Sequence, residues 1–226
     1  REALAGLDGP TVIAPALDGQ PQAEPAAQDV DLAPGSAAAL VAAARKLDVT
    51  VPVVVQTLWS LVLADMTGRQ DIVSGTTVSG RPAELAGAES MVGLFINTLP
   101  VRVGVRHDET LAELVRRTAD EQAALLAHHH VALARIQKLT DTGGPLFDTL
   151  CVFENYLVDT GTDEQAAAEA KEFAGLRVEA VTGRDATHYP LTLVAAPGPD
   201  GGPVLRLRYR TDALSAADAT RVAARL

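Results

Sequence analysis

Two spacings of hydrophobic residues recur along the chain, and together they predict interleaved helices and strands. Apolar residues three and four apart predict helices, whereas short runs rich in β-branched residues predict strands. The predicted helices cover residues 36–47, 51–67, 110–128 and 216–226. The predicted strands cover residues 71–79, 99–105, 147–156, 176–181, 189–195 and 204–209. This order of elements predicts an α/β fold, a mixed sheet with helices packed on it.

Polar residues and glycines mark the ends of these elements. Ser36, Thr50 and Ser215 each precede an apolar run and are residue types that cap helices. Gly68 follows the second helix as a stop signal, and that helix is apolar nearly all round, which is typical of a buried helix. The Pro-Gly-Pro-Asp-Gly-Gly sequence at 197–202 predicts a hairpin between the last two strands.

Two stretches follow neither spacing. Residues 1–35 are rich in Pro, Gly, Ala and Asp, and their prolines break any long helix. This composition predicts an extended segment lying along another part of the protein, or else a disordered tail. Residues 159–171 are acidic and Ala-rich, which predicts a loop or a short exposed helix. We therefore place the start of the main folded domain at residue 36.

Composition and charge exclude several classes of protein. The chain has 226 residues, 47% of them hydrophobic, which is enough for one large domain or two small ones with a sizeable core. Its net charge of −10 argues against binding to nucleic acid or to an anionic membrane surface. A lone cysteine excludes an internal disulfide framework and fits the cytoplasm. Charged residues interrupt every apolar stretch before it reaches membrane-spanning length, and we find no signal peptide. The chain begins with Arg1 rather than Met, which suggests a fragment.

The sequence lacks the common signatures of catalytic and cofactor sites. It has no Gly-x-Gly-x-x-Gly, no phosphate-binding loop, no paired cysteines for zinc and no Gly-x-Ser-x-Gly elbow. None of the five histidines is followed by Asp at the fourth position, so the His-x-x-x-Asp pattern is absent. We therefore assign no catalytic residue and no metal ligand.

Three conspicuous features have plain structural interpretations. Adjacent residues on a helix point in different directions, so the histidines at 128–130 are interpreted as a polar helix end rather than a metal site. Cys151 lies in an apolar strand, which predicts a buried and unreactive thiol. His188 directly precedes a predicted strand and is interpreted as a polar group at its edge.

Two further segments suggest a ligand site. Ser79 and Arg81 lie at the end of a predicted strand, where α/β sheets tend to bind ligands. Asn97 and Thr98 form a polar pair inside an apolar run, and a buried amide needs hydrogen-bond partners. Asn97 could hold a loop through backbone hydrogen bonds, or it could bind an amide-bearing ligand in a channel. The sequence leaves both alternatives open.

Several blocks of sequence resemble the condensation domains of nonribosomal peptide synthetases. They are residues 75–82 with 89–102, residues 128–137, residues 146–156 and residues 187–192. Each block alone is moderately specific, and their occurrence in the family's order is much more so. The resemblance extends from residue 50 to the C-terminus.

The resemblance implies half of a two-lobed enzyme. Condensation domains have two lobes, each folded like chloramphenicol acetyltransferase, with a tunnel between them and a His-His-x-x-x-Asp-Gly motif in the N-terminal lobe. The amine of one carrier-bound aminoacyl thioester attacks a second carrier-bound thioester and forms an amide. This chain resembles only the C-terminal lobe, at residues 36–226, with residues 1–35 as an extended linker from a missing N-terminal lobe. The fragment is therefore expected to be inactive alone.

Roles for individual residues also follow from the resemblance. Ser79, Arg81, Asn97 and Thr98 are expected to line or shape the substrate tunnel. Residues 159–185 are expected near the latch that reaches the other lobe. Structural motif positions are expected at Gly93, Phe95, Phe147, Asp148, Asn155 and Tyr189.

The resemblance further implies which molecules this chain contacts. Its partners are the N-terminal lobe, the upstream and downstream peptidyl carrier domains and the adjacent adenylation domain, with no nucleic acid and no membrane. No cofactor is bound directly, because the substrates are carried on the phosphopantetheine of the carrier domains.

Three alternatives to this interpretation remain. The chain could dock carrier or neighbouring domains without catalysis. It could be an epimerisation-type relative, although residues 78–82 do not match the Glu-Gly-His-Gly-Arg-Glu of that branch. It could be a stand-alone trimeric acyltransferase, against which the missing His-x-x-x-Asp argues.

Overall fold

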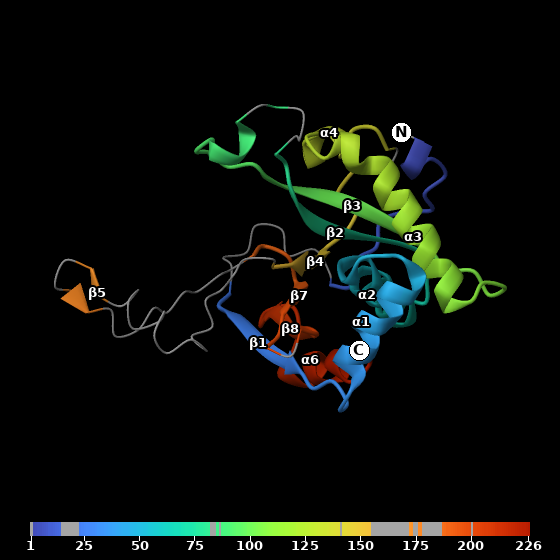
Figure 1. The fold of residues 1–226 in the computed structure, drawn as a ribbon. Coiled ribbons are helices and arrows are strands. Elements are labelled where there is room, and N and C mark those ends of the chain that lie inside the picture. Colours follow the sequence, from blue (N-terminus) through green and yellow to red (C-terminus); the bar gives the residue numbers. More distant parts are fainter. Residues whose placement is uncertain are drawn as a thin grey trace.

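Six of the described strands form one mixed sheet, which Figure 1 shows in a computed structural model of the chain. The order of the strands is β1-β8-β7-β4-β2-β3, and β4 runs parallel to both of its neighbours. The structure describes residues 2–14, 23–81, 85, 87–140, 142–154, 172–173, 176–177, 187–199 and 201–226. The strands of the sheet are β1 (Pro25–Val30), β2 (Asp71–Ser79), β3 (Ile96–Gly104), β4 (Thr149–Phe153), β7 (Leu191–Pro197) and β8 (Pro203–Arg210). This mixed sheet confirms the predicted α/β class.

Helices cover both faces of this sheet. Successive strand residues point to opposite faces, so the partners of Ile72 and of Val73 distinguish the two. Helices α2 and α6 pack on the Ile72 face, and α3 lies on the same face over β3. Helix α4 packs on the Val73 face. The helices are α1 (Ser36–Leu47), α2 (Val51–Thr67), α3 (Leu111–Leu125), α4 (Leu133–Gln137) and α6 (Ala216–Ala223), with 3-10 helices at Glu2–Leu4, Ala88–Ser90 and Leu126–His128. A separate two-stranded sheet pairs β5 (Glu172–Phe173) with β6 (Leu176–Arg177).

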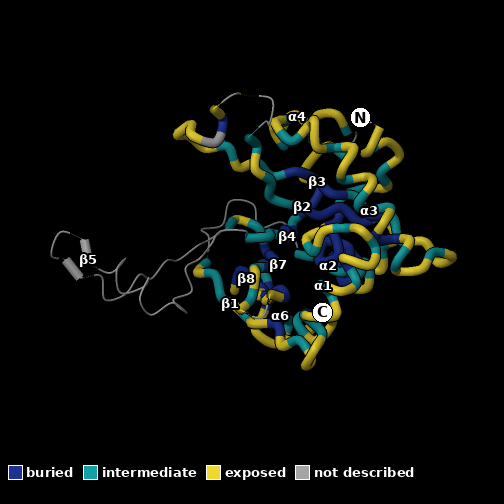
Figure 2. The backbone as a smooth tube through the Cα atoms, in the orientation of Figure 1, coloured by how far each residue is buried: buried dark blue, intermediate teal, exposed yellow. Residues whose placement is uncertain are grey.

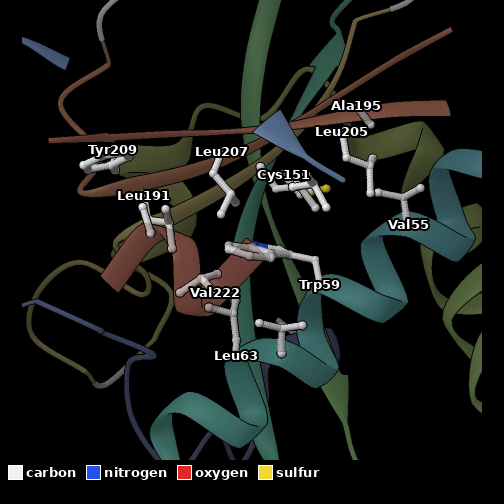
Figure 3. Close-up of a cluster of buried hydrophobic side chains, with 14 of the residues drawn as sticks. Val55, Trp59, Leu63, Cys151, Leu191, Ala195, Leu205, Leu207, Tyr209 and Val222 are labelled. Atoms are coloured by element: carbon white, nitrogen blue, oxygen red, sulfur yellow. The ribbon is translucent and has the colours of Figure 1, made fainter. Parts of the chain in front are cut away.

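The main core lies between α2 and the strands β4, β7 and β8. Trp59 and Leu63 of α2 are fully buried against Leu193, Leu207 and their neighbours, as Figure 3 shows for this cluster. Full burial of each large apolar side chain stabilises the fold by about 1.5–3 kcal/mol. The prediction that the second helix is buried is therefore confirmed. No single described helix is long and apolar enough to cross a membrane; only α1 and α2 taken together, bent by 110°, meet that test.

The helix caps agree with the sequence in part. Ser215 is confirmed as a cap, because its hydroxyl accepts a hydrogen bond from the Asp218 N–H and the Asp218 carboxylate accepts one from the Ser215 N–H. Gly68 ends α2 in a left-handed conformation. The prediction for Ser36 is wrong: α1 begins at Ser36 itself, and its N-cap is Gly35 with φ of 85°. Thr50 occupies the N-cap of α2 without a side-chain cap hydrogen bond.

Several strand ends differ from the prediction. The predicted strand 99–105 begins earlier, at Ile96, because β2 and β3 pair over their whole length from Asp71↔Gly104 to Ser79↔Ile96. The predicted strand 147–156 is shorter, at Thr149–Phe153. The hairpin at 197–202 is confirmed by the pairing of β7 with β8. Most of the predicted strand 176–181, and the stretch 159–171, lie outside the described residues.

The sheet begins before residue 36, where we placed the start of the folded domain. Pro25–Val30 forms β1, which pairs antiparallel with β8 along its whole length at one edge of the sheet. The sequence did not identify this strand, because it starts with Pro and has a single β-branched residue, Val30. Proline is tolerated at the start of an edge strand. For Pro25–Val30, the extended alternative is therefore the one observed.

Candidate functional site

The predicted tunnel residues lie at the end of the β2–β3 hairpin where β2 ends and β3 begins. We call this region the hairpin tip and define it as residues 79–81, 85 and 87–98. Register pairs Ser79 with Ile96, Val78 with Asn97 and Thr77 with Thr98. Because strand pairing sets these positions, Ser79, Asn97 and Thr98 lie within three successive rungs of one ladder. Ser79 is exposed there, and Thr98 is half-buried.

Arg81 holds the turn that follows β2. Its Nη1 donates a hydrogen bond to the carbonyl oxygen of Ala88, and its Nη2 donates to that of Met91 at 3.0 Å. The guanidinium also lies 4.2 Å from the centre of the Phe95 ring. A contact of this kind contributes about 0.5–1 kcal/mol at an exposed site. Arg81 therefore binds its own turn, which is a structural use of a residue that we expected to shape the tunnel.

Asn97 joins the hairpin to the segment after α3. Its Nδ2 donates to the carbonyl oxygens of His129, at 2.8 Å, and Val131, at 2.9 Å, and its Oδ1 accepts from the N–H of Thr98 at 3.0 Å. Of the two alternatives left open by the sequence, the structure shows loop holding through the backbone. The bond also connects two sequence blocks that are more than thirty residues apart. The tunnel role of Asn97 remains a prediction.

Large apolar side chains at the hairpin tip face the solvent. Val92 is 104% exposed, Leu94 89% and Ile96 52%, and Met91 and Leu85 are also exposed. In Figure 2 this end of the hairpin is mostly coloured as exposed, in contrast to the buried middle of β2 and β3. A cluster of exposed apolar residues usually marks a contact surface. Gly93 lies within this cluster, and an added Cβ there would meet the Phe95 ring at 3.4 Å.

Two of the remaining motif residues, Phe147 and Tyr189, lie on the Val73 face of the sheet. Phe147 is buried and stacks with Tyr189, their ring centres 5.8 Å apart and their planes 16° apart. Burial raises the pKa of the Tyr189 hydroxyl above its usual value. The carboxylate of Asp148 accepts hydrogen bonds from the backbone of residues 13 and 14. Asn155 lies outside the described residues.

The histidine run begins at the end of a helix and the cysteine is buried, as interpreted from the sequence. The 3-10 helix Leu126–His128 follows α3, and burial lowers the pKa of His129. No group of three or more potential metal ligands occurs in the part of the chain that the structure describes. Cys151 is buried, which raises the pKa of its thiol to about 12, so the prediction of an unreactive thiol is supported. His188 is exposed and lies just before β7, as interpreted.

The sequence did not predict the contacts of residues 2–14. Thr11 is fully buried beside β2, and Arg102 of β3 forms hydrogen bonds with backbone carbonyls of this segment. A buried Thr in a Pro- and Gly-rich stretch gave no periodic signal, so only the tertiary structure identifies it.

Among the described residues, the hairpin tip offers an apolar surface and side chains that hold the backbone through hydrogen bonds. Its described residues do not offer a nucleophile paired with a base.

Known proteins match this chain in both sequence and fold. The family model for the condensation domain matches residues 10–226. Chondramide synthase cmdD of Chondromyces crocatus is 36% identical over 206 residues, which cover 88% of this chain and 5% of that protein. Bacitracin synthase 3 of Bacillus licheniformis is 36% identical over 157 residues, which cover 70% of this chain and 2% of that protein. The chain thus spans only a small part of the curated relatives that it matches.

Solved structures agree with this assignment of the fold. The X-domain from teicoplanin biosynthesis matches 99% of this chain and 50% of its own, with a TM-score of 0.76 and 24% identity. The first condensation domain of the calcium-dependent antibiotic synthetase, in complex with a substrate analogue, matches 97% of this chain and 46% of its own, with a TM-score of 0.69 and 18% identity. This chain therefore belongs to the condensation-domain family of nonribosomal peptide synthetases, the family that forms amide bonds.

Proposed function

We propose that this chain is the C-terminal lobe of a condensation domain, and that it forms an amide bond between carrier-bound thioesters only together with an N-terminal lobe. One observation carries the proposal: the family model matches residues 10–226, while this chain covers only 44% and 46% of two solved structures of condensation domains. The sequence supports it further, since it contains no His-His-x-x-x-Asp-Gly.

In this proposal the hairpin tip contributes a tunnel wall and a contact surface for the N-terminal lobe. The exposed side chains of Val92 and Leu94 suit such a contact, because burying them in an interface removes apolar area from water. Ser79 and Thr98 would face the substrates. Arg81 and Asn97 would shape the wall indirectly, through the backbone that they hold.

The reaction itself would depend on groups outside this chain. An upstream carrier presents an aminoacyl or peptidyl thioester on phosphopantetheine, and a downstream carrier presents an aminoacyl thioester. The amine attacks the thioester carbonyl, an amide C–N bond forms, the C–S bond breaks, and the upstream thiol leaves with the proton that the amine gives up. The N-terminal lobe would supply the histidine that positions the amine or accepts its proton. The neighbouring adenylation domain and a cytoplasmic location belong to the same proposal.

Reconstitution from separate lobes tests the proposal. This chain, an N-terminal lobe from the same synthetase and two loaded carriers are mixed, and amide product is measured by mass spectrometry. Product is expected only when both lobes are present. The matched control is an N-terminal lobe in which the second motif histidine is replaced by Ala. Amide formation by this chain alone would contradict the proposal.

A docking module without catalysis is a second candidate, favoured by the exposed apolar tip. It predicts chemical-shift changes at the tip when a phosphopantetheinylated carrier is added, and no product even with both lobes present. Product in the reconstitution above would exclude it.

A further inference from the structure

Residues 2–14 lie across one face of the sheet. We call residues 2–14 the strap. Leu4 and Leu7 of the strap pack against the buried cluster that contains Val73, Phe147 and Leu150. The strap therefore covers part of the sheet face that α4 also covers, and its two halves are held by different kinds of contact.

Thr11 fills the space where β2 and β4 separate. These two strands pair directly only at Gly75↔Leu150 and Thr76↔Cys151. Before that point, Thr11 takes the place of a strand: its N–H donates to the carbonyl oxygen of Leu146 at 2.9 Å, and its own carbonyl oxygen accepts from the N–H of residue 148 at 3.3 Å. Its hydroxyl oxygen accepts from the N–H of residue 73 at 2.8 Å, and the residue is 0% exposed. Thr11 thus satisfies backbone groups of β2 and of residues 146–148, just before β4, where the ladder between the two strands ends.

Asp148 holds Ile13 and Ala14, the last two residues of the strap. The N–H of Ile13 donates to both carboxylate oxygens, at 3.1 and 2.9 Å, and the N–H of Ala14 donates to one of them at 3.0 Å. Hydrogen bonds to a charged acceptor are stronger than neutral ones. Burial raises the pKa of the Asp148 carboxyl, and the backbone N–H groups of Ala14 and Ile13 partly oppose this rise. The Asp148 carboxylate is half-buried, and its hydrogen bonds to the strap offset part of the free-energy cost of burying its charge.

The polar contacts of the outer part of the strap are more exposed to solvent and therefore weaker. Arg102 donates from Nη1 to the carbonyl oxygen of Ala5 at 2.8 Å and pairs with Asp71, while Arg69 pairs with Asp8. The Asp8 side chain is 59% exposed. Exposed ion pairs contribute little to stability and are screened by salt. The polar contacts of the outer strap are therefore weaker than those made by Thr11 and Asp148, and the outer strap also depends on the packing of Leu4 and Leu7.

We propose that Thr11 and Asp148 are positioning residues that fix the inner strap, residues 11–14, against β2 and the segment just before β4, so that this point of the chain stays with this lobe. One consequence rests on the proposed function: if the strap leads from the N-terminal lobe, the connection between the lobes bends before Thr11 and not after it. The fixed position of Thr11 would then determine where the connection between the two lobes can bend relative to the tunnel wall.

Hydrogen exchange of this chain, read amide by amide by NMR, tests the proposal. In Asp148→Ala, the amides of Ile13 and Ala14 are expected to exchange about tenfold faster or more, because they lose a charged acceptor. Asp148→Asn keeps one acceptor oxygen and is expected to lie between Ala and wild type. Thr11→Val keeps the shape but removes the hydroxyl acceptor, and is expected to speed exchange of the Val73 amide by about tenfold.

Asp8→Ala is the matched control, because it removes a carboxylate from the outer part of the strap. It is expected to leave exchange at residues 13 and 14 unchanged. The proposal is overturned if Asp148→Ala leaves these amides unchanged, or if exchange rises equally in β7 and β8, which would show only a loss of global stability. These results are independent of amide formation: a two-lobed protein that forms no amide would defeat the proposed function and leave the exchange result standing.

Discussion

Trp59 in the main core and Val92 at the hairpin tip are both large apolar residues, yet the first is 0% exposed and the second 104%. In the core, the side chains of α2, β4, β7, β8 and α6 bury one another, so that this region is complete within the chain. At the tip, Arg81 and Asn97 hold the backbone by hydrogen bonds, while the apolar side chains remain in solvent. The core is therefore stabilised by side chains that pack against one another within the chain. The tip is held by hydrogen bonds to its backbone, and its apolar side chains form an exposed surface.

The largest effect is expected from emptying the core. Trp59→Ala removes a fully buried side chain, and such changes lower the free energy of unfolding by about 3–5 kcal/mol. The measurement is urea unfolding followed by circular dichroism, because Trp59 is the only tryptophan and its fluorescence is lost. The matched control, Val204→Ala on the exposed side of β8, is expected to stay within about 0.5 kcal/mol. Similar losses in the two variants would contradict the contrast between core and surface.

A smaller effect is expected from overfilling the sheet. A Cβ added at Gly75 would lie 2.3 Å from the Phe147 ring and 2.4 Å from Leu150, so Gly75→Ala forces these side chains to move. Overpacking of this kind costs about 1–3 kcal/mol. Gly104→Ala, at the paired end of β3, meets nothing within 4 Å and is expected to stay within about 1 kcal/mol of wild type. Equal melting temperatures for the two variants would show that the sheet face is less tightly packed than described.

At the tip, local order is expected to change more than global stability. Arg81→Ala releases the carbonyl oxygens of Ala88 and Met91, so exchange of the Gly80 and Ser90 amides is expected to rise several-fold, by roughly 3–10 times. The free energy of unfolding is expected to fall by less than about 1 kcal/mol. Arg81→Lys is the matched control, because it keeps the charge but loses the planar fork, and it should rescue exchange only in part. A large loss of global stability would show that the tip belongs energetically to the core.

The smallest effect is expected at the C-terminal cap. The pKa of Asp218 is lowered, first by the Ser215 hydroxyl, then by the Ser215 N–H and by Arg221. A carboxyl whose pKa is lower in the folded state stabilises the fold above its ordinary pKa, and this contribution is lost as the pH falls through the folded value. The melting temperature of wild type should therefore fall more steeply below about pH 4 than that of Asp218→Asn. Parallel curves for the two proteins would contradict a role for this carboxylate in the cap.

The tip also marks the limit of what could be predicted for the candidate site. The sequence singled out Arg81 at the end of a predicted strand and Asn97 as a polar residue inside an apolar run. It could not identify their partners, because Asn97 binds carbonyl oxygens more than thirty residues away and Arg81 binds a turn that has no periodic signal. Hydrogen bonds to backbone carbonyls leave no trace in side-chain pattern, since every residue carries such a carbonyl.

The amino-acid sequence alone was sufficient to predict the α/β class, the buried helix α2, the last hairpin and the Ser215 cap, because local spacing and local residue type encode these features. It also identified the family, through blocks whose order is readable without a structure. The folded structure was needed to show that Pro25–Val30 is an edge strand and that Thr11 fills the split between β2 and β4. Both depend on which segments become neighbours after folding. The pairing of β1 with β8, and the bonds of residues 11 and 13 to partners 62 and 135 residues away, are set by the order of the sheet rather than by the segment itself.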